Sequence, residues 1–175
     1  QDRPAFERTV ELAAAGDAAA FSRLVVEHHA TMARVAFVIV GDVEVAQDAV
    51  QSAWALAWRR LSTLRDPAQV RPWLVAIAAN EARQALRRGR RARIVDLSAA
   101  GDPLGSADPA DVIGLVDLER ALVRLKPEDR TLLALRFVAG LDSVEIARHL
   151  GGSPSGIRSR LARLIARLRM DLDHD

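Results

Sequence analysis

The residues best suited to bind a polyanion lie near the C-terminus, where serine and arginine recur on one face of an expected helix. Arg158 stands at the border of that face, whose members are Ser155, Ser159, Arg160, Arg163 and Arg167. Arginine can hold guanine through two parallel hydrogen bonds, a contact that discriminates between bases by about 1–3 kcal/mol. The small serines allow the helix backbone to approach base edges. A basic face by itself is more often a solvated surface, so its neighbours must decide between the two interpretations.

The segment before this helix has the capping and turn residues of a helix-turn-helix unit. Asp142 and Glu145 have the spacing of a capping box at the start of a short helix. Gly151 and Gly152 permit a left-handed turn, and Ser153 followed by Pro154 is typical of a helix start. We therefore expect a helix-turn-helix domain between residues 115 and 169 whose last helix, near 154–170, enters the DNA major groove.

A second basic stripe lies in the N-terminal half, on an expected helix over residues 70–88. Asn80, Arg83 and Arg87 recur there at helical spacing, after Ala76. Such a stripe could form one wall of a groove for a nucleic-acid strand, with Asn80 hydrogen bonding to a base edge. A solvated basic face explains these residues equally well. Trp73 belongs to the apolar face of the same helix, and we assign it to the core.

The helix before it also has two distinct faces. Its core face consists of small and branched apolar residues: Ala46, Ala49, Val50, Ala53 and Ala57. Its other face consists of Asp48, Gln51, Ala55 and Trp58. A tryptophan away from the core stripe, beside polar residues, indicates a protein interface. Packing of Trp58 beneath the N-terminal helix is an equally good explanation.

Composition and periodicity predict an all-α protein of two small helical domains. The 175 residues include no Cys and no Tyr, and half of them are hydrophobic, mainly of types that pack helices. Residues 96–114 are rich in Gly, Pro and Asp, and predict a flexible acidic linker. The expected division is residues 1–93, a linker over 94–114, and residues 115–175. The sequence shows neither a membrane-spanning run nor a signal peptide, which predicts a cytoplasmic location without membrane insertion.

Catalytic chemistry finds little support in the sequence. His28 and His29 form the notable histidine pair, but adjacent residues point in different directions on a helix, and no carboxylate pattern completes a metal site. We expect no catalytic residue, no metal and no cofactor. A duplex-binding regulator with an N-terminal sensing domain is the first rival hypothesis. It requires a ligand pocket or phosphoacceptor, for which the first half offers no convincing candidate.

The order of several short motifs resembles one family over nearly the whole chain outside the linker. In the first half the matching segments are residues 16–21 (GDAAAF), 46–51 (AQDAVQ) and 71–80 (RPWLVAIAAN). In the second half they are residues 125–127 (LKP), 135–141 (LRFVAGL), 145–147 (EIA), 150–151 (LG) and 158–161 (RSRL). In this order and spacing, the chain resembles bacterial sigma factors of the extracytoplasmic-function (ECF) group, which keep sigma regions two and four.

The resemblance implies a role for each surface. The β′ clamp helices of core RNA polymerase would bind Asp48, Gln51, Ala55 and Trp58. The melted −10 promoter element would bind Leu64, Arg65, Asn80, Arg83 and Arg87. The duplex −35 element would bind Ser155, Arg158, Ser159, Arg160, Arg163 and Arg167, while the same domain sits on the β flap.

The resemblance further implies promoter-specific initiation of transcription, in which the polymerase performs the chemistry, and it adds an anti-sigma protein as a candidate partner. The final helix begins Ser155-Gly156-Ile157 where the family usually has Gly-Thr-Val, so the promoter sequence does not transfer from relatives. A degenerate relative that binds polymerase without directing initiation remains an alternative.

Overall fold

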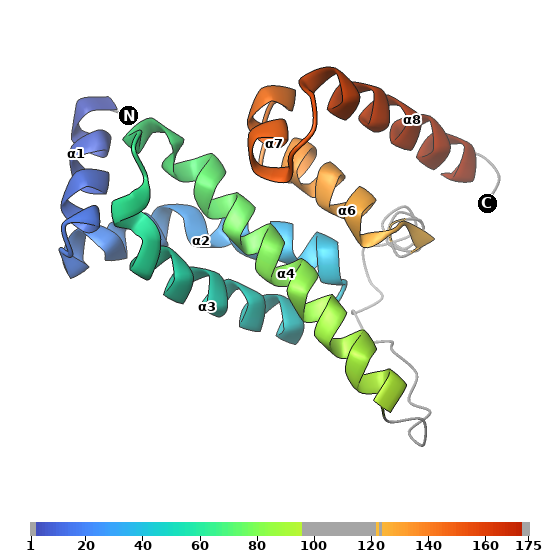
Figure 1. Cartoon of the computed structure of the whole chain (residues 1–175), viewed down its shortest axis with the longest axis horizontal. Coiled ribbons are helices and arrows are strands. Elements are labelled where there is room, and N and C mark those ends of the chain that lie inside the picture. Colours follow the sequence, from blue (N-terminus) through green and yellow to red (C-terminus); the bar gives the residue numbers. More distant parts are fainter. Residues whose placement is uncertain (1–2, 96–121, 123, 173–175) are drawn as a thin grey trace, which may run out of the picture.

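The computed structural model describes residues 3–95, 122 and 124–172 (Figure 1). The elements of the first half are α1 (Arg3–Ala14), α2 (Ala18–Val40), α3 (Val43–Arg60), the short 3-10 helices η1 (Leu61–Thr63) and η2 (Pro67–Gln69), and α4 (Val70–Val95). Those of the second half are α6 (Pro127–Leu133), the π-helical turn η4 (Ala134–Val138), α7 (Ser143–Leu150) and α8 (Pro154–Leu172). The described residues contain no strand, and the expected all-α class with its C-terminal helix-turn-helix is confirmed.

Local sequence signals fix where the first helices begin and end. The carboxylate of Asp17 accepts a hydrogen bond from the backbone N–H of Ala20 at 3.0 Å, which caps the start of α2. Gly41 adopts a left-handed φ of 74° and ends that helix. Asp42 then caps α3 by accepting from the N–H of Val45 at 2.9 Å. A Gly-Asp pair therefore closes one helix and opens the next.

The core of the first half lies between α2, α3 and α4, which pack side by side (Figure 1). The expected core face of α3 is confirmed, since Ala46, Ala49, Val50, Ala53 and Ala57 are all buried. Alanine at these positions allows the helix backbones to approach closely. Larger side chains from the other helices, Leu24, Met32 and Leu74 among them, fill the remaining space.

The apolar spacing of residues 127–138 predicts one continuous α-helix, and the structure differs from this expectation at its end. Its last turn is a π-helix, because the carbonyl of Ala134 accepts from the N–H of Ala139, five residues on. Gly140 follows with a φ of 69°, and the N–H of Leu141 bonds back to the carbonyl of Leu135. Spacing of apolar residues does not distinguish this wider turn from an α-helical one.

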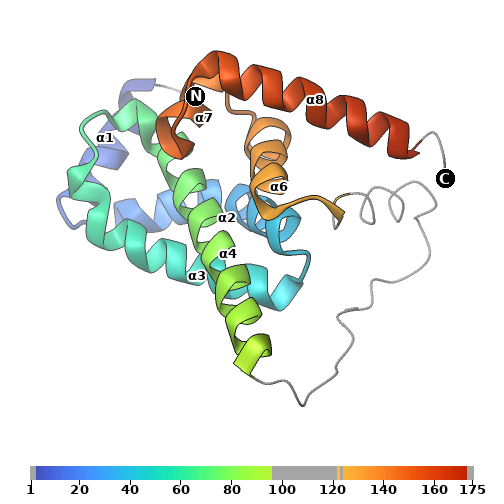
Figure 2. The same ribbon diagram turned by 45° about the vertical axis from the view of Figure 1, so that its right-hand side comes forward.

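The two halves of the chain pack against each other. α6 and η4 contact α2 and α4, while α7 contacts α4 near its N-terminal end (Figures 1 and 2). The guanidinium of Arg71 donates to the carbonyl of Ala139, and Arg148 donates to Oε1 of Gln69. Ala76, which helical spacing puts in line with Asn80, Arg83 and Arg87, is only 4% exposed. The part of this stripe that reaches solvent therefore begins at Asn80.

Several expectations fall outside the described residues. They concern residues 96–114 of the linker and almost all of a helix that the sequence predicts over 115–125. They also concern the side chains of Arg90, Arg91 and Arg93, which we expect to extend the positive charge of the stripe on α4. α4 itself extends to Val95, two residues beyond the domain end that we expected. Within the described part of the chain, no helix combines the length and apolar character needed to cross a bilayer.

Candidate nucleic-acid interface

The turn that leads into α8 has the geometry that the sequence predicts. Oδ1 of Asp142 accepts from the N–H groups of Val144 and Glu145 at 2.8 Å, and Glu145 accepts from the N–H of Asp142 at 2.8 Å. This reciprocal capping box fixes the start of α7. Gly151 and Gly152 both have positive φ, 83° and 91°, where a side chain would be strained.

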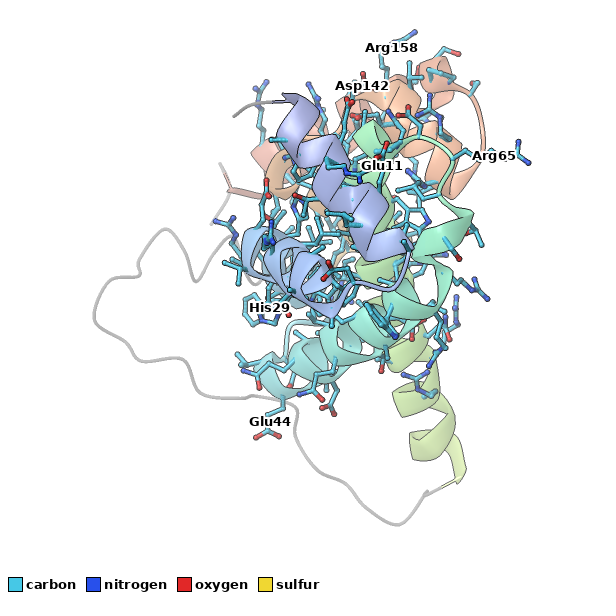
Figure 3. The ribbon with its side chains drawn as sticks, turned by 90° about the vertical axis from the view of Figure 1, so that its left-hand side faces the viewer. Glu11, His29, Glu44, Arg65, Asp142 and Arg158 are labelled. Carbon is cyan, nitrogen blue, oxygen red and sulfur yellow. The ribbon has the colours of Figure 1, made fainter. Side chains whose placement is uncertain are left out.

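α8 is held by one face and exposes the other. Ile157, Leu161 and Leu164 are buried against α6 and α7. Ser153 caps the helix, since its hydroxyl accepts from the N–H of Gly156 at 3.1 Å. All six predicted −35 residues are exposed: Ser155, Arg158, Ser159, Arg160, Arg163 and Arg167. Arg158 projects away from the body of the molecule (Figure 3).

One of these arginines already has a partner within the protein. Nε and Nη2 of Arg160 both donate to Oδ1 of Asp129, at 2.8 and 2.6 Å. Asp129 lies in the first turn of α6 and is 8% exposed, whereas the Arg160 side chain is 44% exposed. The pair therefore joins α6 to α8 at the edge of the exposed face.

The predicted strand-binding residues of the first half lie on α4 and on the loop before it. Asn80 and Arg87 are exposed and Arg83 is half-buried, all at helical spacing on α4. In the loop, Leu64 is half-buried while Arg65 extends outward into solvent (Figure 3). The adjacent Asp66 caps η2 by accepting from the N–H of Ala68 at 3.0 Å, which fixes the path of the loop into α4.

The exposed face of α3 carries the residues that we expected to bind protein. Asp48, Gln51 and Ala55 are exposed along it, and Trp58 retains 45% of its surface. The Trp58 ring packs edge-on against Phe21 of α2, with centroids 4.8 Å apart. The ring of Trp58 thus packs on a neighbouring helix and still exposes part of its surface. The two interpretations of Trp58 that the sequence left open do not exclude each other, and its place in a protein interface stays a prediction.

The three histidines that the structure describes, His28, His29 and His149, do not come together in one site. His28 is buried against the edge of Phe6, and burial, reinforced by Arg71 and opposed by Glu27, lowers its pKa. His29 accepts a hydrogen bond from the indole of Trp54 at 3.3 Å. Burial together with Arg148 lowers the pKa of His149. The described residues contain no group of three or more His, Cys, Asp or Glu side chains arranged to hold a metal ion.

Three polar residues that form long-range hydrogen bonds could not be identified as such from the sequence. Asp129 reads as an ordinary acidic residue in a first helical turn, and Arg71 and Arg148 as solvated charges. Their partners lie 31, 68 and 79 residues away along the chain. Only the tertiary arrangement brings these groups together.

Comparison with known proteins matches both halves of the chain. Residues 24–92 match Sigma-70 region 2, and residues 115–168 match Sigma-70 region 4. A probable RNA polymerase sigma factor of Xanthomonas campestris, RfaY, is 36% identical over 91% of the chain, which spans only 42% of that relative. The ECF RNA polymerase sigma factor SigL of Mycobacterium tuberculosis is 30% identical, over 91% of this chain and 93% of the relative.

The fold has a counterpart among solved structures. CnrH, solved in complex with the cytosolic domain of CnrY, superposes with a TM-score of 0.72 at 28% identity, covering 98% of this chain and 99% of CnrH. The similarity therefore extends over both helical halves.

Proposed function

The chain belongs to the ECF RNA polymerase sigma factors, and we propose that it directs promoter-specific initiation of transcription. The proposal assigns the −35 element to the second half of the chain, and core polymerase and the −10 element to the first. The boundaries we propose for these functions are residues 1–93 and 115–175, joined by a linker over 94–114. The polymerase supplies the catalytic residues, and this chain supplies recognition.

The observation that carries the proposal is the two-sided character of α8. Its buried stripe anchors it to α6 and α7, while its opposite side presents serine and arginine beyond a capped glycine turn. A helix of this type places its N-terminal turns in the major groove. Ser155 and Ser159 then allow close approach, and Arg163 has the length to reach guanine or phosphate.

The −10 element is proposed to bind along α4 and the loop before it. Asn80, Arg83 and Arg87 follow one another at helical spacing on α4, with Asn80 and Arg87 exposed and Arg83 half-buried. Arg65 and Leu64 stand at the start of this path, one offering charge and the other apolar surface. A positive groove with base-binding side chains suits an unpaired strand better than a rigid duplex.

The exposed face of α3 is the proposed site for the β′ clamp helices of core polymerase. Its polar members, Asp48 and Gln51, surround a half-exposed aromatic surface at Trp58. Tryptophan is over-represented among residues that dominate binding energy at protein interfaces. Phe21 holds the ring in place, so little conformational entropy is lost when a partner covers it. The second half would meet the β flap.

The contact between the halves adds a step to this mechanism. Gln69 lies between Arg65 and Asn80 of the proposed −10 surface, and Arg148 precedes the proposed −35 surface, yet their side chains touch. Elements near −10 and −35 are separated by about 25 base pairs, on the order of 85 Å along B-DNA. We therefore propose that the halves separate before both elements are bound.

An anti-sigma protein is the proposed regulator. CnrH, a structural relative, was solved with the cytosolic domain of CnrY bound. This chain has an apolar groove across α2, α3 and η4 that a protein partner could cover, with Phe37, Val43 and Val138 in its lining. Val43 is 59% exposed.

Transcript sequencing after overexpression tests the proposal in cells. We expect a limited set of new start sites, with two shared sequence motifs near −35 and −10. New transcripts without any shared upstream motif would contradict a promoter-specific role.

A further inference from the structure

The ion pair between Asp129 and Arg160 places an acidic residue at the base of the proposed DNA-reading helix. Asp129 is the one buried carboxylate among the described side chains, and a single oxygen accepts two hydrogen bonds from Arg160. Charge-assisted hydrogen bonds of this length are stronger than neutral ones. The pair ties the second turn of α8 to the first turn of α6.

The angular position of Arg160 is closer to the buried stripe of α8 than that of Arg163. At 3.6 residues per turn, Arg160 lies about 70° from the centre of the buried stripe. Arg163 lies about 130° from that centre, and Ser159 about 170°. Arg160 therefore emerges beside the packed side of the helix, while Ser159 and Arg163 face outward. From this position the guanidinium of Arg160 reaches Asp129 of α6, while part of its side chain stays exposed.

We infer that Asp129 is a positioning residue for −35 recognition, acting through Arg160 to fix the rotation of α8. This inference rests on the proposed function of α8. Arg160 then fixes α8 to α6 through its ion pair with Asp129 and does not contact a base, in contrast to the role expected from the sequence. Without this ion pair, α8 can rotate about its axis on the apolar stripe. Ser159 and Arg163 then no longer point at the base edges.

The inference makes a prediction opposite to that of simple electrostatics. Removing a negative charge near DNA should strengthen binding to phosphates, and it would free Arg160 to bind DNA as well. If Asp129 positions α8, removing its charge weakens selective binding instead. Glu128 offers a matched control, because it is the adjacent acidic residue in the same turn but is exposed.

The experiment uses holoenzyme made from the full chain and core polymerase, with a duplex that wild-type holoenzyme selects from a random pool. We expect Asp129→Asn to bind the selected duplex about tenfold more weakly, the size of one misaligned base contact. For Asp129→Asn, binding to a scrambled duplex and binding to core polymerase should each change less than about twofold. For Glu128→Gln, binding to the selected duplex, to the scrambled duplex and to core polymerase should all change less than about twofold. Unchanged or tighter selective binding by Asp129→Asn would overturn the inference.

A second variant covers the case in which Asp129→Asn fails to fold. Replacing both members of a buried ion pair by apolar residues of similar size is often tolerated. We expect Asp129→Leu combined with Arg160→Met to fold and to recover most of the selective affinity. A loss as deep as that of Arg160→Ala would overturn the inference, because it would show that the guanidinium itself reads DNA. If wild-type holoenzyme selects no duplex, the proposed function fails instead.

Discussion

The side chain of Arg148 in α7 donates a hydrogen bond to Gln69, which lies 79 residues earlier at the start of α4. A second bond, from Arg71 to the carbonyl of Ala139, joins the same two halves. These contacts hold α7 and the end of η4 against the start of α4 (Figure 2). They also provide a direct way to test whether the halves must separate.

A cleavable crosslink between the halves should block initiation. The sequence has no Cys, so Gln69→Cys with Arg148→Cys supplies the two reactive thiols. We expect a reducible bis-maleimide to join them within one molecule and transcription with core polymerase to fall at least about tenfold. Cleaving the linker should restore it. Single-cysteine variants control for modification alone, and full activity of the crosslinked chain would contradict separation.

Arg163→Ala should weaken −35 binding without changing core binding. Loss of one arginine–base contact costs about 1–3 kcal/mol, and Arg163 is exposed on the outer face of α8. Gel shifts of holoenzyme on promoter DNA and a pull-down of core polymerase measure the two activities separately. Arg169→Ala removes an exposed arginine from another side of the same helix and should have a smaller effect. An equal loss in both assays would show that the assigned face is wrong.

Trp58→Ala should reduce core binding even under conditions where the variant is fully folded. The edge-on contact with Phe21 adds about 0.5–1.5 kcal/mol to folding beyond the apolar surface that the ring buries, and an interface tryptophan contributes about 2 kcal/mol or more to binding. Urea unfolding and a core-polymerase pull-down measure the two effects. Val26→Ala, at an 84% exposed position on α2, is the control. A Trp58→Ala variant that binds core normally would remove Trp58 from the interface.

Acidification should destabilise the fold through the buried His28 and the half-buried His149. Burial lowers the pKa of both His28 and His149 below the ordinary value of 6.5. Below pH 6.5 the unfolded chain therefore binds protons that the folded chain does not, and the free energy of unfolding falls as pH falls through this window. Urea unfolding at pH 7.5 and 5.5 measures the change. An unaltered pH dependence in the double variant His28→Leu with His149→Gln would exclude these groups as its source.

The sequence predicts the helix-turn-helix because the signals that define it are local. Asp142 and Glu145 are three residues apart, and the glycine turn and Ser153 cap follow within the same segment. The buried face of α3 is also predictable, since helical spacing alone places its alanines together.

The contacts between distant segments could not be predicted in this way. The bonds from Arg71 to Ala139 and from Arg148 to Gln69 join segments 68 and 79 residues apart, and no periodicity within one helix indicates such pairs. Helical periodicity places Arg160 nearer to the buried stripe than Arg163, but only the packing of α6 beside α8 shows that its partner is Asp129. The roles of the exposed residues on α4 and α8 remain predictions until DNA contacts are measured.

Transcription reconstituted from purified components tests the central claim most directly. Core polymerase, this chain and a promoter identified from its own transcripts should give one defined start, and core polymerase alone should give none. Start sites should disappear when either upstream motif is scrambled, because each half of the chain is proposed to bind one of them. Failure to initiate at every such promoter, despite stable binding to core polymerase, would contradict the assignment of promoter recognition to this chain.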